Sequence, residues 1–208
     1  MHAIPRGLLA ALSLTISIAS PVAAGASPED TVRTTADRAL EILANQALAT
    51  DQKTEQLADL LDGVSDFETT SKLVLARGWR DFSDQQRKEF EKLLRDYLIA
   101  RYRNNVDDYA GEKVEILGGR TEPRGDYTVH TKVAGGKRGT PILVDYRLRK
   151  DDDGGWRVID IVAEGISLVS NLRSQFQSLL SRGGPEKLIS TLRKKVETGD
   201  VEPAEGTL

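Results

Sequence analysis

The strongest constraint in this sequence is a change in the spacing of its apolar residues near Tyr109. Upstream of that point apolar side chains recur at helical spacing, and downstream they alternate with polar ones, as in half-buried strands. The alternating part holds four short runs, separated by the glycine pairs at 118–119, 135–136 and 154–155. Four consecutive strands with short connections predict an antiparallel four-stranded meander sheet with one apolar face. Helices before and after this sheet, without alternation of single strands and helices, predict an α+β fold.

The periods also predict the position of each element. A capping box formed by Ser83 and Gln86 opens the clearest helix, whose apolar stripe runs from Phe90 to Leu98. The fourth strand is apolar on both faces, which favours a central place in the sheet. We expect helices at 28–49, 57–63, 67–78, 83–98, 168–180 and 185–196, and strands at 113–117, 126–133, 141–150 and 156–164.

Residues 1–26 have the features of a secretory signal peptide. Arg6 precedes an apolar run at 7–18, and small residues then lead to cleavage after Ala24 or Ala26. The run is shorter than the roughly 20 apolar residues of a membrane span, so an uncleaved anchor is the less favoured alternative. We therefore expect residues 27–196 to form a single soluble domain in the periplasm, followed by a disordered acidic tail at 197–208.

The chain lacks the residue types that several chemistries need. It has no cysteine, and His130 is the only histidine beyond the signal segment, so the usual soft-metal ligands are missing. His130 lies on the less apolar face of its strand and is expected to be an exposed strand residue rather than a catalytic base. The acidic run at 151–155 predicts a hairpin turn rather than a calcium loop. A formal net charge of −3 gives no electrostatic basis for binding nucleic acid.

Two carboxylates, Asp160 and Glu164, interrupt the apolar segment "WRVIDIVAEGISLVSNLRSQF" at 156–176. On one strand their backbones would lie roughly 13 Å apart, which is wider than the 5–9.5 Å between the paired carboxyl groups of glycosidases. We therefore predict structural roles: Asp160 pairs with an arginine on a neighbouring strand, and Glu164 ends the strand before a turn at Gly165. No catalytic or metal-binding residue is predicted.

Five segments point together to one known family: "LARGWRDFSDQQRKEFEKLLRDYLIARY", "YAGEKVEIL", "VDYRLRK", "GGWRVIDIVAEGISLVSNLRSQFQSLL" and "GGPEKLISTLRKK". They resemble the MlaC, or toluene-tolerance, family of periplasmic phospholipid-binding proteins, and the similarity runs from about Thr31 to Lys195. The resemblance implies a sheet with surrounding helices and a shuttle that carries phospholipid as cargo, without a cofactor. It implies two partners, an outer-membrane lipoprotein–porin complex and an inner-membrane ABC transporter that bears a mammalian-cell-entry domain. A branch of the family associated with hopanoid biosynthesis stays open.

The residue pattern alone favours a filled core. The resemblance favours an apolar pocket lined by the same residues. The pocket would lie between the apolar sheet face and the helix stripes Phe90–Leu98 and Leu172–Leu180, with the lipid headgroup mostly in solvent. The lipid-binding residues expected on this basis are Leu94, Tyr97, Leu98, Ile116, Val129, Val144, Tyr146, Val162, Ile166 and Leu172. We expect a monomer. A small periplasmic enzyme and a protein-binding adaptor are the alternatives from other functional classes.

Overall fold

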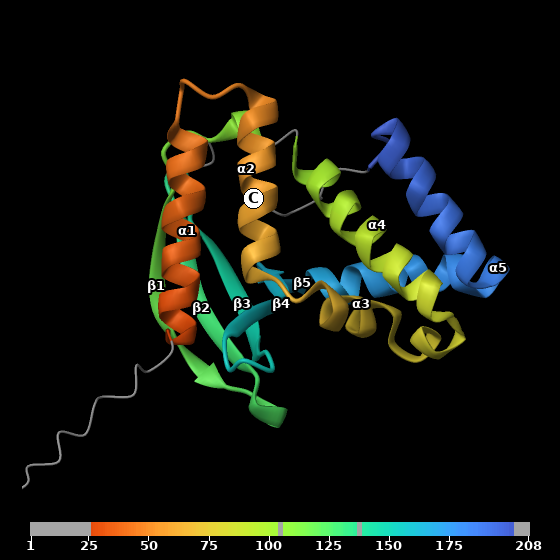
Figure 1. The fold of residues 1–208 in the computed structure, drawn as a ribbon. Helices are drawn as coiled ribbons and strands as arrows, with labels where there is room; N and C mark the ends of the chain where they lie inside the picture. Colours follow the sequence, from red (N-terminus) through yellow and green to blue (C-terminus); the bar gives the residue numbers. More distant parts are fainter. Residues whose placement is uncertain (1–25, 104–105, 137–138, 202–208) are drawn as a thin grey trace, which may run out of the picture.

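The computed structural model describes residues 26–103, 106–136 and 139–201, and the predicted signal peptide and most of the predicted tail lie outside these ranges. The α+β prediction is confirmed, with helices around one antiparallel sheet (Figure 1). The helices are α1 (Pro28–Ala44), α2 (Thr50–Val64), α3 (Phe67–Leu75), α4 (Asp84–Arg103) and α5 (Leu168–Thr198), with short 3-10 turns η1 (Ala76–Asp81), η2 (Val106–Asp108) and η3 (Pro123–Gly125). The strands are β1 (Lys113–Thr121), β2 (Tyr127–Ala134), β3 (Ile142–Lys150), β4 (Trp156–Ala163) and β5 (Ile166–Ser167).

At the start of α4 and after the end of α1, polar side chains form hydrogen bonds with backbone amides. The predicted capping box of α4 is confirmed, because the Ser83 amide donates to Gln86 Oε1 at 2.9 Å and the Gln86 amide to Ser83 Oγ at 3.3 Å. The prediction of one helix through residue 49 is wrong. Asn45 adopts an extended backbone conformation and its Oδ1 accepts from the Ala47 amide at 3.0 Å, a local turn that ends α1.

The sheet is a meander in the order β1-β2-β3-β4-β5, antiparallel throughout. It has one strand more than predicted, because the chain reverses at Glu164–Gly165 and pairs two further residues with β4. The fourth strand lies between β3 and β5, so it is not an edge strand. On the side away from β3, its described partners are the two residues of β5 and a single bridge from Ser65 to Val158. Helices α2, α3 and α5 also contact β4, which explains its apolar character on both faces.

The apolar residues form two separate clusters. In the first, α1 packs on one face of the sheet, which we call the inner face (Figure 1). Val32 of α1, Val129 of β2 and Leu148 of β3 are its fully buried centre. The second cluster lies beside the sheet and joins α3, α4 and α5, with Phe176 in edge-to-face contact with Phe90 at 6.0 Å and with Tyr97 at 6.3 Å.

The last helix has two straight parts, as the sequence predicts. Gly184 breaks α5 with φ +66° and ψ −163°, a conformation that L-residues with a side chain rarely adopt, and Pro185 starts the next turn. The second part folds back along α4, where Leu188 and Leu192 are fully buried in the helical cluster. Helix α5 continues to Thr198, so it includes the first two residues of the predicted tail, and Val201 still packs on this cluster.

Among the described residues, one cation is buried, near the C-terminal end of α4. Arg101 continues the buried face of α4 that carries Phe90, Leu94 and Tyr97, and it is only 8% exposed. Its Nε and Nη1 atoms have no hydrogen-bond partner in the part of the chain that the structure describes. A buried donor without a partner costs about 1–3 kcal/mol, so this side chain lowers the stability of the fold.

We predict that Arg101→Met raises the free energy of unfolding by about 1–3 kcal/mol, since it keeps the apolar stem and removes the unpartnered guanidinium. Urea unfolding monitored by circular dichroism measures the change. The matched control is Arg95→Met on the same helix, where Asp62 accepts two hydrogen bonds of 2.6 Å. The control should lose up to about 1 kcal/mol. A larger loss at Arg101 than at Arg95 would contradict the prediction.

Candidate functional site

Four of the predicted lipid-binding residues lie together on the inner face of the sheet. Val129 is opposite Tyr146, and Thr131 is opposite both Ile116 and Val144, so strand pairing places them in one patch. Val129 and Val144 are fully buried, at 0% and 2% exposure, whereas Ile116 and Tyr146 are only half-buried. Within this patch, Val129 and Val144 are therefore closely packed, whereas Ile116 and Tyr146 keep accessible surface.

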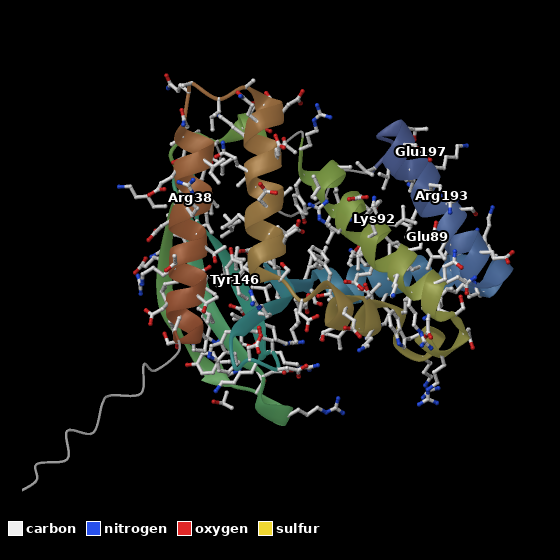
Figure 2. All side chains as sticks on the ribbon, in the orientation of Figure 1. Arg38, Glu89, Lys92, Tyr146, Arg193 and Glu197 are labelled. Carbon is white, nitrogen blue, oxygen red and sulfur yellow. The ribbon has the colours of Figure 1, made fainter. Side chains whose placement is uncertain are left out.

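Tyr146 defines the less covered part. Its side chain keeps accessible surface, and yet burial raises the pKa of its phenol above the ordinary value. Tyr146 packs against the cluster of Val32, Val129 and Leu148, and part of its surface stays accessible. In Figure 2 the Tyr146 label lies between α1 and α2, over the sheet. The inner face around Tyr146 is thus a wall that neighbouring side chains do not fully cover.

Sequence reasoning missed a further residue of this wall. Ile161 is paired with Tyr146 across β3 and β4 and is half-buried. A β-bulge separates the pairs Arg147–Asp160 and Leu148–Val158, so Ile159 is an extra residue in β4. Strict alternation along β4 does not reveal this shift, and only the pairing with β3 shows which residues point inward.

Val162 does not join the inner patch, because it is paired with Asp145 on the opposite, outer face of the sheet. Ile166 of β5 is paired with Ala163, which is paired with Val144, so it lies on the inner side at the end of the sheet, where it is 54% exposed. The prediction that Val162 shares one pocket wall with Val129 is therefore wrong.

The four predicted residues on helices also lie elsewhere. Leu94, Tyr97, Leu98 and Leu172 belong to the helical cluster and are 0–6% exposed. The apolar stripes of α4 and α5 pack against each other and against α3. Each stripe is buried by the other helices and therefore does not need the sheet. The prediction that they face the apolar side of the sheet is wrong, since α1 covers that side.

The two carboxylates of the 156–176 segment have structural roles. Asp160 is 4% exposed, accepts from Ser167 Oγ at 2.7 Å and from the Val169 amide at 3.0 Å, and lies 3.7 Å from Arg147. The predicted arginine partner is confirmed, and the contacts with the start of α5 are additional. Glu164 has φ +48° in the turn with Gly165, and its side chain accepts from the Leu143 amide.

The other polar groups of the sheet form ion pairs and turn contacts. His130 Nδ1 lies 2.8 Å from Asp145 Oδ1 on the outer face, and both side chains are about one third exposed. Asp151 closes the β3–β4 turn by accepting from the Gly155 amide at 2.7 Å and from Arg157 at 2.8 Å, as the sequence predicts for a hairpin. Within the described ranges, no group of three or more histidine, cysteine or acidic side chains could hold a metal ion.

A polar depression of about 710 Å³ lies between the α2–α3 junction and the β3–β4 turn. Its lining includes the acids Asp66, Glu68 and Glu91 and the bases Lys72 and Arg157. Burial, together with Glu68 and Asp66, raises the pKa of Glu91. Several of these charges are already paired, for example Lys72 with Glu68 at 2.6 Å, and none of the predicted apolar residues lies here.

Comparison with known proteins agrees with this architecture. A curated relative, the intermembrane phospholipid transport system binding protein MlaC of Haemophilus influenzae, is 24% identical over 65% of this chain and 64% of its own length. A phospholipid-binding protein of Ralstonia solanacearum, solved in complex with a phospholipid, is 26% identical, with a TM-score of 0.75 over 84% of this chain and 99% of the neighbour. The family model described as MlaC protein matches residues 33–194. The chain therefore belongs to the MlaC protein family.

Proposed function

We propose that this protein is a soluble periplasmic carrier that moves phospholipid between the outer and inner membranes. The observation that carries the proposal is the inner face around Tyr146, where half-buried apolar side chains remain under α1 and α2. The solved relative with a bound phospholipid supports a lipid ligand for this fold. The curated relative supports the transport role.

Apolar burial alone is enough to hold such a cargo. Burying one methylene is worth about 0.8 kcal/mol, so two chains of roughly 16 carbons gain on the order of 25 kcal/mol gross. The acyl chains would lie along Ile116, Tyr146 and Ile161 on the inner face, with the headgroup near solvent. Such a carrier needs no catalytic group, and Asp160 and Glu164 are already engaged in structural contacts. The family is one of lipid-binding transport proteins rather than enzymes.

The location and partners follow from the same role. None of the described helices combines the length and the apolar content that a bilayer span requires. We infer export through the signal peptide at 1–26, and a monomer that exchanges lipid with two complexes. These are an outer-membrane lipoprotein–porin complex and an inner-membrane ABC transporter with a mammalian-cell-entry domain.

Mass spectrometry of an organic extract should find phospholipid bound to the protein purified from its native periplasm without detergent. The wild-type chain should carry near-stoichiometric lipid. An extract with a hopanoid would move the protein to the hopanoid-associated branch. An extract without lipid would contradict the carrier function.

We predict that Ile116→Trp lowers the co-purified phospholipid several-fold, because the larger ring fills space on the half-buried inner wall. Lipid phosphorus per mole of protein measures the effect, and circular dichroism reports whether the variant folds. The matched control is Glu115→Trp, the preceding residue on the opposite face of β1, which should keep its lipid.

The stability of these two variants separates a lipid site from a filled core. A ligand at 100 times its dissociation constant stabilises the folded state by about 2.7 kcal/mol, so delipidated wild type should melt at a lower temperature than loaded wild type. Ile116→Trp should lose that difference, whereas Glu115→Trp should retain it. If Ile116 instead lies in a filled core, overpacking should cost about 1–3 kcal/mol without a selective loss of lipid.

The mature N-terminus should be Gly25 or Ser27, as cleavage after Ala24 or Ala26 requires. Intact-mass spectrometry of protein released by osmotic shock measures it. A membrane-bound product that retains Met1 would refute export by signal cleavage.

A further inference from the structure

The outer face of the sheet carries exposed apolar surface. Among the described residues, three large apolar side chains are at least half exposed: Leu117 at 50%, Leu143 at 55% and Ile166 at 54%. Leu117 of β1 and Leu143 of β3 are far apart in sequence, and yet they border one depression together with Val162. We call these three residues the outer-face patch. Soluble proteins seldom gather exposed apolar groups in this way unless a partner covers them.

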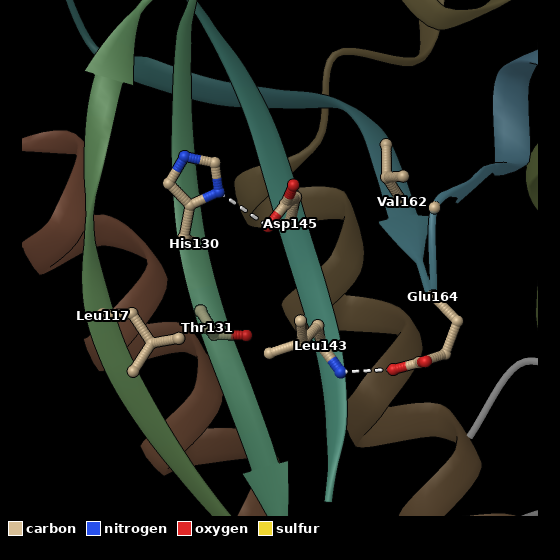
Figure 3. A pocket seen from close by; sticks show the side chains of 8 residues that line it. Leu117, His130, Thr131, Leu143, Asp145, Val162 and Glu164 are labelled. Carbon is tan, nitrogen blue, oxygen red and sulfur yellow. Dashed lines mark hydrogen bonds and ion pairs between the residues drawn. The ribbon is translucent and has the colours of Figure 1, made fainter.

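The depression is distinct from the proposed lipid site. It has a volume of about 360 Å³ and opens on the side of the sheet away from α1 and α2, which lie behind the strands in Figure 3. Its outward-facing residues His130, Asp145 and Val162 follow one another across β2, β3 and β4. The sheet itself therefore separates the patch from Tyr146, and a ligand on one face need not touch the other.

The charged residues around the outer-face patch indicate what kind of partner could bind there. The titratable side chains that line the depression are Asp145, Glu164 and His130, so its charged lining is acidic. The nearest outer-face cations have partners, because Lys132 pairs with Glu115 and Arg147 faces Asp160. A cation from outside would thus meet two carboxylates beside apolar surface, an arrangement that attracts basic groups.

Three other occupants fit less well. An anionic membrane surface would be repelled by Asp145 and Glu164. A second copy that docked through the same patch would bring those carboxylates together with their own counterparts. The C-terminal sequence "ETGDVEPAEGTL" carries acids and no base, so it would be repelled as well.

We propose that the outer-face patch is a docking surface for a partner protein, and that it binds a segment with an aliphatic side chain next to a lysine or arginine. The aliphatic group enters the depression between Leu117 and Leu143, and the cation lies against Asp145 and Glu164. The inference extends the proposed carrier function by assigning lipid and protein partner to opposite faces of one sheet. Its geometry does not depend on which lipid is bound.

Photocrosslinking in intact cells tests the proposal. The photoreactive residue p-benzoylphenylalanine replaces Leu143, and a matched chain carries it at Gln175, an exposed position of α5 outside the patch. Mass spectrometry then identifies the crosslinked peptide. We expect a peptide from another protein in which an aliphatic residue stands within two positions of lysine or arginine, at a yield well above that of Gln175.

Two variants in the Leu143 background test the recognition chemistry. Asp145→Asn combined with Glu164→Gln removes both charges but keeps oxygen acceptors for His130 and the Leu143 amide, and Leu117→Ser removes apolar surface from the lining. Each should lower the crosslink yield about three- to ten-fold, with an unchanged melting temperature. A crosslink to a second copy or to lipid, a yield equal to that of Gln175, or no response to both variants would overturn the proposal.

Lipid content measured on the same samples keeps the two proposals apart. Crosslinking to the expected segment by a protein without lipid would refute the carrier function and leave the docking surface intact. Bound lipid with no patch-specific crosslink would refute the docking surface alone.

Discussion

The architecture depends on one buried carboxylate at the junction of the sheet and the helices. Asp160 accepts from Ser167 and from the Val169 amide, so the end of β4 and the first turn of α5 share a partner. Arg147 of β3 lies 3.7 Å away and offsets the negative charge. A charge that is only 4% exposed is tolerated because it is both paired and hydrogen-bonded. These contacts hold α5 at the β4 edge of the sheet rather than across its inner face.

Because α5 lies at the edge of the sheet, the apolar side chains form two separate clusters. Phe90, Tyr97 and Phe176 complete a close-packed helical cluster that does not need the sheet. The inner face of the sheet is left to α1, whose Val32 buries only part of it. Side chains such as Ile116 and Tyr146 therefore keep accessible surface although they point inward. A stable cluster beside an incompletely covered wall allows a carrier to bind and release apolar cargo without losing its fold.

The two faces of the sheet have different chemistry because neighbouring residues of a strand point to opposite sides. On β3, Val144 and Tyr146 face α1, while Leu143 and Asp145 face outward. Apolar cargo and a basic, aliphatic protein segment can thus be bound back to back. The two surfaces lie on opposite sides of one sheet, so neither binding event has to displace the other.

The sequence by itself determined the features that depend on short-range periodicity and capping. The positions of β2, β3 and β4, the Ser83–Gln86 cap of α4, the break before Pro185 and the inward direction of Ile116, Val129, Val144 and Tyr146 follow from local patterns. The glycine pair at 118–119, predicted as a turn, instead lies inside β1. Only the tertiary structure decided what each apolar stripe packs against, because any stripe is buried equally well by the sheet or by another helix. It likewise decided the inward direction of Ile161 and the outward direction of Val162, since the extra residue at Ile159 exists only in the pairing with β3. Leu94, Tyr97, Leu98 and Leu172 were predicted at the wrong surface for that reason: hydrophobicity is not directional, and the contacts that choose its partner lie far away in sequence.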